Sequence, residues 1–362
     1  MAAHQTAKPT AKRKRAKASA QRKSDAPDPL SLPELQRRLA NPDIPIETLE
    51  PYLLVVPDPE TGAPKLAPNP KTVSQMDDPG LRTRGMGGMD ALNGAERVRR
   101  RVAFERRLIF EKKPVILAEG DSWFEYPFFL ADTIDALSKD YNVFCLSAAG
   151  DTMANMSANI EVVESLFTLV ETRKLPVRAV ILSAGGNDIV GDTLARCVRT
   201  FAGQITAEEL LDRTRLQAEL DKVMRGYQRI IAKLRAVRSD VPILVHGYDH
   251  AIPLNPPLPD HPWAKDPIRK IAPRDGWLAT PLRSKKIMDP KLQAGIVRLM
   301  IDAFYLRLQG FADATGTGTT KGVYLIDNRQ TVKTRWNDEL HPTDAGFADV
   351  AANFAKVLKA LP

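Results

Sequence analysis

The chain has 362 residues, of which 43% are hydrophobic and 27% are charged, and its formal net charge is +8. This balance is typical of a folded globular protein and excludes a largely disordered chain. No run of about 18 apolar residues occurs, which excludes a helix that spans a bilayer, and the length allows one large domain with appendages or two domains at most.

The positive charge is concentrated at the N-terminus. Residues 1–24 hold eight Lys and Arg and no acidic residue, so the other 44 basic residues equal the 44 acidic ones in number. We expect this tail to be disordered, and it could act as a targeting signal, bind a polyanion such as nucleic acid or anionic lipid, or simply be solvated. It lacks the apolar stretch of a secretory signal, and the only cysteines are Cys145 and Cys197, so we expect a cytoplasmic protein.

Residues 25–110 form a predicted N-terminal extension that is rich in proline up to about residue 90. Ser31 and Glu34 have the spacing of a capping box, which predicts a short helix as far as Leu39. Residues 52–56 could form a strand, and the flanking prolines indicate an edge strand. A predicted helix over residues 95–110 carries six arginines, a charge run more typical of a solvated face than of a binding surface.

Residues 111–362 carry the pattern of an α/β domain. Short apolar runs at 115–117, 143–146, 179–182, 243–245 and 323–326 are separated by segments with helical periodicity. Strands that alternate with helices predict a parallel sheet, because each parallel crossover needs a helix to return the chain. We therefore predict a three-layer α/β/α fold of the flavodoxin-like kind with a five-stranded parallel sheet, in which ligands gather at the carboxyl ends of the strands.

The segments between these strands differ in character. Ile160, Val163, Phe167 and Val170 share one predicted helical face, and the row from Phe347 to Leu361 marks a closing helix. Residues 206–237 read as an extended helix or a helical pair. The proline-rich residues around 251–290 form a lid-like insertion or an ordered surface excursion.

A candidate nucleophile follows the first predicted strand, in Gly120-Asp121-Ser122-Trp123. Serine is a poor nucleophile unless a base lies within hydrogen-bond reach. His341 follows the fifth strand, and Asp338 three residues earlier could accept from one ring nitrogen while the other nitrogen faces Ser122. We expect His246, at the end of the fourth strand, to be a structural histidine.

Two further groups lie at the carboxyl ends of the second and third strands. These are Gly150 and the run Gly185-Gly186-Asn187-Asp188. Backbone N–H groups near glycine and an asparagine amide can stabilise the oxyanion that forms during acyl transfer. The alternatives are turn formation for the glycines and helix capping for Asn187 and Asp188.

Together these blocks resemble the SGNH hydrolase family, also called GDSL esterases and lipases. Gly120-Asp121-Ser122, Gly150, Gly185-x-Asn187-Asp188 and Asp338-x-x-His341 match its blocks in order, over about residues 114–362. The resemblance implies a triad of Ser122, His341 and Asp338, and an oxyanion hole made by the N–H groups of Ser122 and Gly150 and the Asn187 amide. Gly120, Asp121, Gly185 and Asp188 would support them.

The sequence departs from the family at Trp123, where the family motif has leucine. The aromatic residues at 123–129 could wall an acyl pocket or pack in the core.

The resemblance implies hydrolysis of a small-molecule, lipid or carbohydrate ester, with no cofactor and no metal. An O-acyltransferase with the same triad stays open, as does a non-catalytic protein tethered to polyanions by residues 1–24. An α/β-hydrolase is excluded because no serine lies in a G-x-S-x-G elbow. Asp249, His250 and His261 have no recognised metal-ligand spacing. The acyl group, its acceptor and the oligomeric state stay open.

Overall fold

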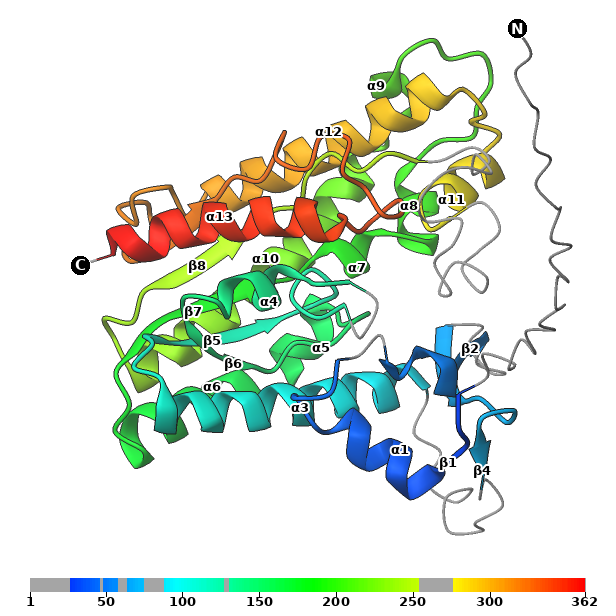
Figure 1. Ribbon diagram of the computed structural model, residues 1–362. Coiled ribbons are helices and arrows are strands. Elements are labelled where there is room, and N and C mark those ends of the chain that lie inside the picture. Colours follow the sequence, from blue (N-terminus) through cyan, green and yellow to red (C-terminus); the bar gives the residue numbers. More distant parts are fainter. Residues whose placement is uncertain are drawn as a thin grey trace, which may run out of the picture.

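A computed structural model describes residues 27–45, 48–57, 64–74, 88–126, 130–253 and 276–361. The predicted tail, residues 1–24, and residues 254–275 of the predicted lid-like insertion lie outside these ranges. The five expected strands are all present: β5 (Val115–Gly120), β6 (Asn142–Cys145), β7 (Val177–Ser183), β8 (Ile243–His246) and β9 (Val323–Ile326). They form one parallel sheet, which confirms the predicted fold class (Figure 1).

The strand order, β6-β5-β7-β8-β9, determines where a ligand can bind. From β5 the chain crosses to β6 on one side and then to β7 on the other. A topological switch point therefore lies at the carboxyl end of β5, and ligands bind in the crevice outside such a point. Ser122 lies two residues past β5. Every residue of β5 is buried, as expected for a central strand covered on both faces.

Helices cover both faces of the sheet (Figure 1). On one face α4 (Thr133–Leu137) packs against the closing helix α13 (Asp344–Ala360). On the other, α10 (Arg213–Val237) packs against α5 (Met153–Ala158), α6 (Glu161–Phe167) and α12 (Pro290–Gln309). The predicted helical pair over 206–237 is found as α9 (Ala207–Leu210) and α10. Phe347, Val350 and Phe354 of the predicted row are buried in α13, Val357 is half-buried on the same helix, and Leu361 is buried just past its end.

The predicted helical face of the 160–170 segment packs against the core only in part: Val163 and Val170 do, whereas its other two members are exposed. Ile160 and Phe167 are 39% and 53% exposed, while Val162, Leu166 and Leu169 are buried. The segment carries two overlapping apolar rows, and the buried row also repeats at helical spacing. The chain then continues through a π-helical turn, η3 (Thr168–Thr172), which ends the regular helical repeat.

The N-terminal extension has a small hydrophobic cluster of its own, which includes Leu35, Leu49 and Tyr52. Helix α1 (Leu32–Leu39) begins after Ser31, whose hydroxyl accepts from the Glu34 N–H (3.3 Å). β1 (Leu30–Ser31) pairs with β4 (Val73–Ser74). After η2 (Glu50–Tyr52), β2 (Leu53–Pro57) pairs only with β3 (Pro64–Pro68) among the described residues, so the predicted strand is an edge strand.

The arginines of α3 (Gly88–Phe110) anchor this helix to the rest of the protein. Arg97 donates to a backbone carbonyl just after β6 (2.7 Å), and Arg99 donates to two carbonyls after α1 (2.8 and 2.7 Å). The Arg100 side chain is only 9% exposed and donates to Asp132 (2.6 Å). The expectation of a solvated face is therefore wrong for these three residues, because their partners lie on distant segments that the local sequence does not reveal.

Candidate active site

Three predicted residues meet at the carboxyl edge of the sheet. The Ser122 Oγ lies 2.8 Å from the His341 Nε2. The His341 Nδ1 lies 2.8 and 2.9 Å from the two carboxylate oxygens of Asp338. All three side chains are buried. A serine is thus hydrogen-bonded to a base whose other nitrogen faces an acid, which is the arrangement that serine nucleophiles require.

A tight turn holds the acid and the base together. Asp338 Oδ1 accepts from the backbone N–H groups of Leu340 (2.7 Å) and His341 (2.8 Å), and the His341 carbonyl accepts from the Asn337 N–H (2.8 Å). Asp338 and His341 are three positions apart, and this spacing lets the Asp338 carboxylate accept from both the backbone N–H and the ring of His341. The imidazole orientation is therefore fixed within a single turn.

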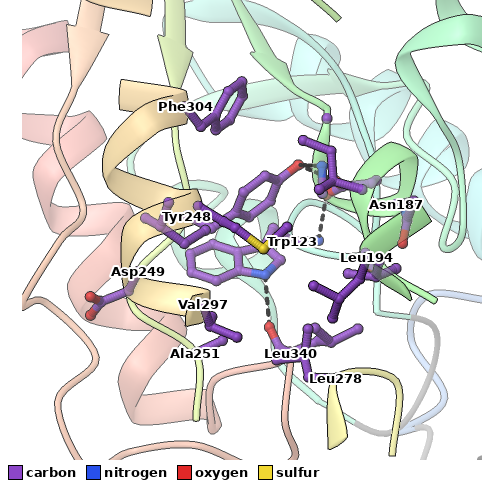
Figure 2. Close-up of a pocket in the computed structure, with 18 residues that line it drawn as sticks. Trp123, Asn187, Leu194, Tyr248, Asp249, Ala251, Leu278, Val297, Phe304 and Leu340 are labelled. Atoms are coloured by element: carbon purple, nitrogen blue, oxygen red, sulfur yellow. Dashed lines mark hydrogen bonds between the residues drawn. The ribbon is translucent and has the colours of Figure 1, made fainter. Parts of the chain in front are cut away.

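Trp123 connects this turn to the segment of Ser122. Its indole N–H donates to the Leu340 carbonyl (2.9 Å), as Figure 2 shows. Its ring packs edge-on against Tyr248 and Phe347, with ring centroids 5.2 and 6.0 Å apart. The tryptophan in place of the family's leucine is therefore a buried residue that packs against aromatic rings and also lines an apolar cavity beside Ser122, and it supplies a hydrogen bond that leucine could not make.

Asp121 is the buried centre of a polar network beside Ser122. Its carboxylate accepts from the Trp123 N–H (3.0 Å), the Ser183 hydroxyl (3.0 Å) and the Tyr248 hydroxyl (2.5 Å). Burial raises the pKa of Asp121 to about 6, although the hydrogen bond from Tyr248 opposes this rise. The Tyr248 hydroxyl in turn accepts from the Gly186 N–H (3.0 Å). The network links the loops that follow β5, β7 and β8.

Sequence reasoning missed Ser183 and Tyr248. Ser183 is the last residue of β7, and Tyr248 lies two residues past β8, so both are at the sheet edge where ligands were expected. Their position at this edge is the feature by which the sequence could have identified them as candidate site residues.

Asn187 and Asp188 hold the loop that contains Gly150. The Asn187 side-chain amide donates to the Asp151 carbonyl (2.8 Å). The Asp188 carboxylate accepts from the N–H groups of Met153 (2.8 Å) and Ala154 (3.3 Å), in the first turn of α5. Asp188 therefore caps a helix, but a distant one, and it joins the loop after β7 to the loop after β6. Burial raises its pKa.

Two glycines allow these close approaches. A Cβ at Gly120 would lie 2.8 Å from both the Phe124 ring and the Ser183 Cβ. Gly185 has a φ of +107°, and a Cβ there would lie 2.9 Å from Val223. A side chain at either position would displace the loops around Ser122.

An apolar cavity opens beside Ser122 (Figure 2). The centre of a water molecule can occupy about 80 Å³ of it, and the empty space around the site, open solvent included, is about 730 Å³. Its walls come from α7 (Gly186–Ile189), α8 (Asp192–Cys197), α12 and the residue before α11 (Ala279–Ser284), and from the segments that follow β5, β8 and β9, the last through Leu340. Asn187 also lines it, whereas Gly150 lines a separate polar cavity.

His246 and Asp249 have structural contacts. His246 is fully buried and stacks on Phe124, and its Nδ1 lies 2.7 Å from the Gly247 carbonyl. Burial lowers its pKa to about 4, so the ring is neutral near pH 7, as expected for a structural histidine. Asp249 accepts from three backbone N–H groups. Among the described residues no group of three His, Cys, Asp or Glu could hold a metal ion, and His261 lies outside them.

No helix in the described part of the chain is long and apolar enough to cross a membrane.

Comparison with known proteins gave structural matches only. No protein-family model and no curated protein matches the chain. A protein named as a GDSL-like lipase, from Bacteroides ovatus, is 16% identical, with a TM-score of 0.33 over 68% of this chain and 54% of that one, so the match spans about half of its length. The lipase Lip_vut3 from a goat rumen metagenome is 12% identical (TM-score 0.42; 68% and 97% covered). A family 3 carbohydrate esterase of Clostridium thermocellum is 15% identical (TM-score 0.35; 69% and 99% covered).

Proposed function

We propose that the chain is a serine hydrolase of the SGNH type, which cleaves a carboxylic ester through an acyl-enzyme intermediate. The observation that carries this proposal is the continuous line of hydrogen bonds from Ser122 through His341 to Asp338. This line lies at the switch point of the sheet, beside an apolar cavity that Ser122 itself lines.

The first half of the reaction acylates Ser122. The Ser122 Oγ attacks the ester carbonyl carbon and passes its proton to the His341 Nε2. Asp338 accepts from the Nδ1–H and stabilises the imidazolium that forms. When the tetrahedral intermediate collapses, the bond to the leaving oxygen breaks, and the His341 Nε2–H returns the proton to that oxygen. The products are the free alcohol and an acyl ester of Ser122.

The negative charge on the former carbonyl oxygen needs donors that are already in place. In this proposal the donors are the N–H groups of Ser122 and Gly150 and the Asn187 side-chain amide. Two features support Asn187 as one of these donors: it lines the same cavity as Ser122, and its contact with Asp151 holds it against the loop of Gly150. A single donor of this kind is worth on the order of 3 kcal/mol in the transition state.

The second half of the reaction frees the enzyme. His341 takes a proton from a water molecule, whose oxygen attacks the acyl carbon, and the collapse of the second intermediate returns that proton to Ser122. If an alcohol replaces the water, the same groups carry out O-acyl transfer.

Replacement of the nucleophile tests the proposal. For Ser122→Ala we expect kcat on an activated ester to fall by about 10⁴-fold or more. Ser239→Ala is the matched control, because Ser239 is exposed and lies at the opposite end of the sheet, before β8. Its kcat should equal that of the parent chain. Equal turnover by both variants would refute the assignment of Ser122.

A further inference from the structure

We infer that the cavity beside Ser122 is a pocket for a hydrocarbon acyl chain, and that the preferred substrates are esters of fatty acids longer than acetate. Acetyl esters would be poor substrates, because an acetyl group leaves the cavity unfilled. The inference rests on the proposed hydrolase function and names its substrate class.

One wall of the cavity is a single face of α12. Val297, Met300, Ile301 and Phe304 recur at helical spacing and all line the cavity. The facing wall comes from the segment after β7 and includes Leu194 of α8. Leu194, Val297 and Phe304 are at most 4% exposed. Figure 2 shows these side chains surrounding one space.

The charged and phenolic groups around the cavity are already engaged with the protein. Asp121 accepts from Ser183, Tyr248 and the Trp123 N–H, and Tyr248 also accepts from the Gly186 N–H. Asp249 accepts from the backbone N–H groups of residues 250, 330 and 332 at 2.6–2.7 Å. A ligand therefore meets hydrocarbon surface, except near Ser122 and the Asn187 amide. A sugar in this cavity would lose hydrogen bonds to water without replacing them, whereas an alkyl chain is favoured there.

The position of His341 determines which half of the ester enters the cavity. The leaving oxygen must receive its proton from the His341 Nε2, so the alcohol has to lie on the side of that nitrogen. Among the described residues, Ser122 and Asn187 line the cavity and His341 does not. The substituent that extends from the carbonyl carbon into the cavity is therefore the acyl chain.

Two ester series separate the two halves of the substrate. In p-nitrophenyl esters of increasing acyl length, kcat/KM should rise by about fourfold for each added methylene until the cavity is full. In alkyl acetates of increasing alcohol length, kcat/KM should stay nearly constant. The inference is overturned if the acetyl ester is the best of the first series, or if only the alcohol series shows the rise.

Substitutions of Val297 should change the acyl-chain length of the best substrate in both directions. Val297→Phe fills the cavity and should move the best substrate to a shorter acyl chain, whereas Val297→Ala should move it to a longer one. Leu306→Phe is the matched control, because Leu306 lies on the same helix but is 66% exposed. Its chain-length profile should match that of the parent. Identical profiles for all three variants would contradict the inference, and Val297→Ala decides the question if Val297→Phe does not fold.

A binding measurement tests the acyl pocket independently of the proposed hydrolase activity. Calorimetry with decanoate, below its micelle concentration, should show saturable binding to the Ser122→Ala chain, weakened by Val297→Phe but not by Leu306→Phe. Decanoate binding without turnover of any ester would refute the hydrolase and keep the pocket. Turnover that favours acetate, without decanoate binding, would refute the pocket and keep the hydrolase. Absence of both would refute both.

Discussion

Arg100 is the residue whose loss should most disturb the frame around the active site. Its side chain is 9% exposed, and it pairs with Asp132, which is fully buried, and with Glu96, which is 10% exposed. It also donates to the Phe124 carbonyl (2.7 Å), two residues past Ser122. Arg100→Met keeps most of the apolar stem but leaves two buried carboxylates without their cation. Breaking a buried pair in this way costs about 3–5 kcal/mol.

Urea unfolding followed by circular dichroism measures this loss. The control is Arg106→Met on the same helix, because Arg106 and its partner Asp43 are 50% and 64% exposed. An exposed pair of this kind contributes about 0–1 kcal/mol. A free energy of unfolding that falls equally in both variants, or by less than about 1 kcal/mol in Arg100→Met, would refute the view that α3 is anchored by buried charge.

Two further predictions concern single side chains. Burial lowers the pKa of His246 from 6.5 to about 4, so the unfolded chain binds a proton more tightly than the folded one. The contribution of neutral His246 to the free energy of unfolding is therefore complete above about pH 6.5. It is lost as the pH falls toward 4, and the loss is about 3 kcal/mol. His246→Phe should flatten this part of the pH dependence of urea midpoints, and equal slopes in both proteins would contradict it. Asn187→Ala should lower kcat by about 10²–10³-fold with little change in KM. The control is Asn155→Ala, which removes only an exposed contact to the Asp151 side chain and should leave kcat unchanged. A change confined to KM in Asn187→Ala would argue against an oxyanion role.

The fold was predictable from the sequence because its signals are local. Each strand is a short apolar run, and a buried parallel strand needs no alternation of polar and apolar residues. The proposed acid and base were also recognisable, since Asp338 and His341 lie in one turn. Ser122 and His341 are 219 positions apart, yet both follow strands, and the carboxyl ends of parallel strands meet at one edge. The parallel topology thus predicts that Ser122 and His341 lie close together, although they are far apart in the sequence.

The features that were not predicted depend on long-range packing. Arg100 reads as surface charge because Asp132 and the Phe124 carbonyl lie 32 and 24 residues away. In the sequence Tyr248 looks like an ordinary aromatic residue of a loop, because its partner Asp121 lies 127 positions away. The cavity wall on α12 is a regular apolar row, and such a row faces a cavity or a solid core according to what packs opposite. None of these distinctions is encoded within a single segment.

Covalent labelling tests the central assignment most directly. A fluorophosphonate probe phosphonylates an activated serine, and digestion followed by mass spectrometry locates the adduct. We predict a single adduct on Ser122, with none in Ser122→Ala and undiminished labelling in Ser239→Ala. An adduct on another serine, or equal labelling of the parent chain and Ser122→Ala, would contradict the account.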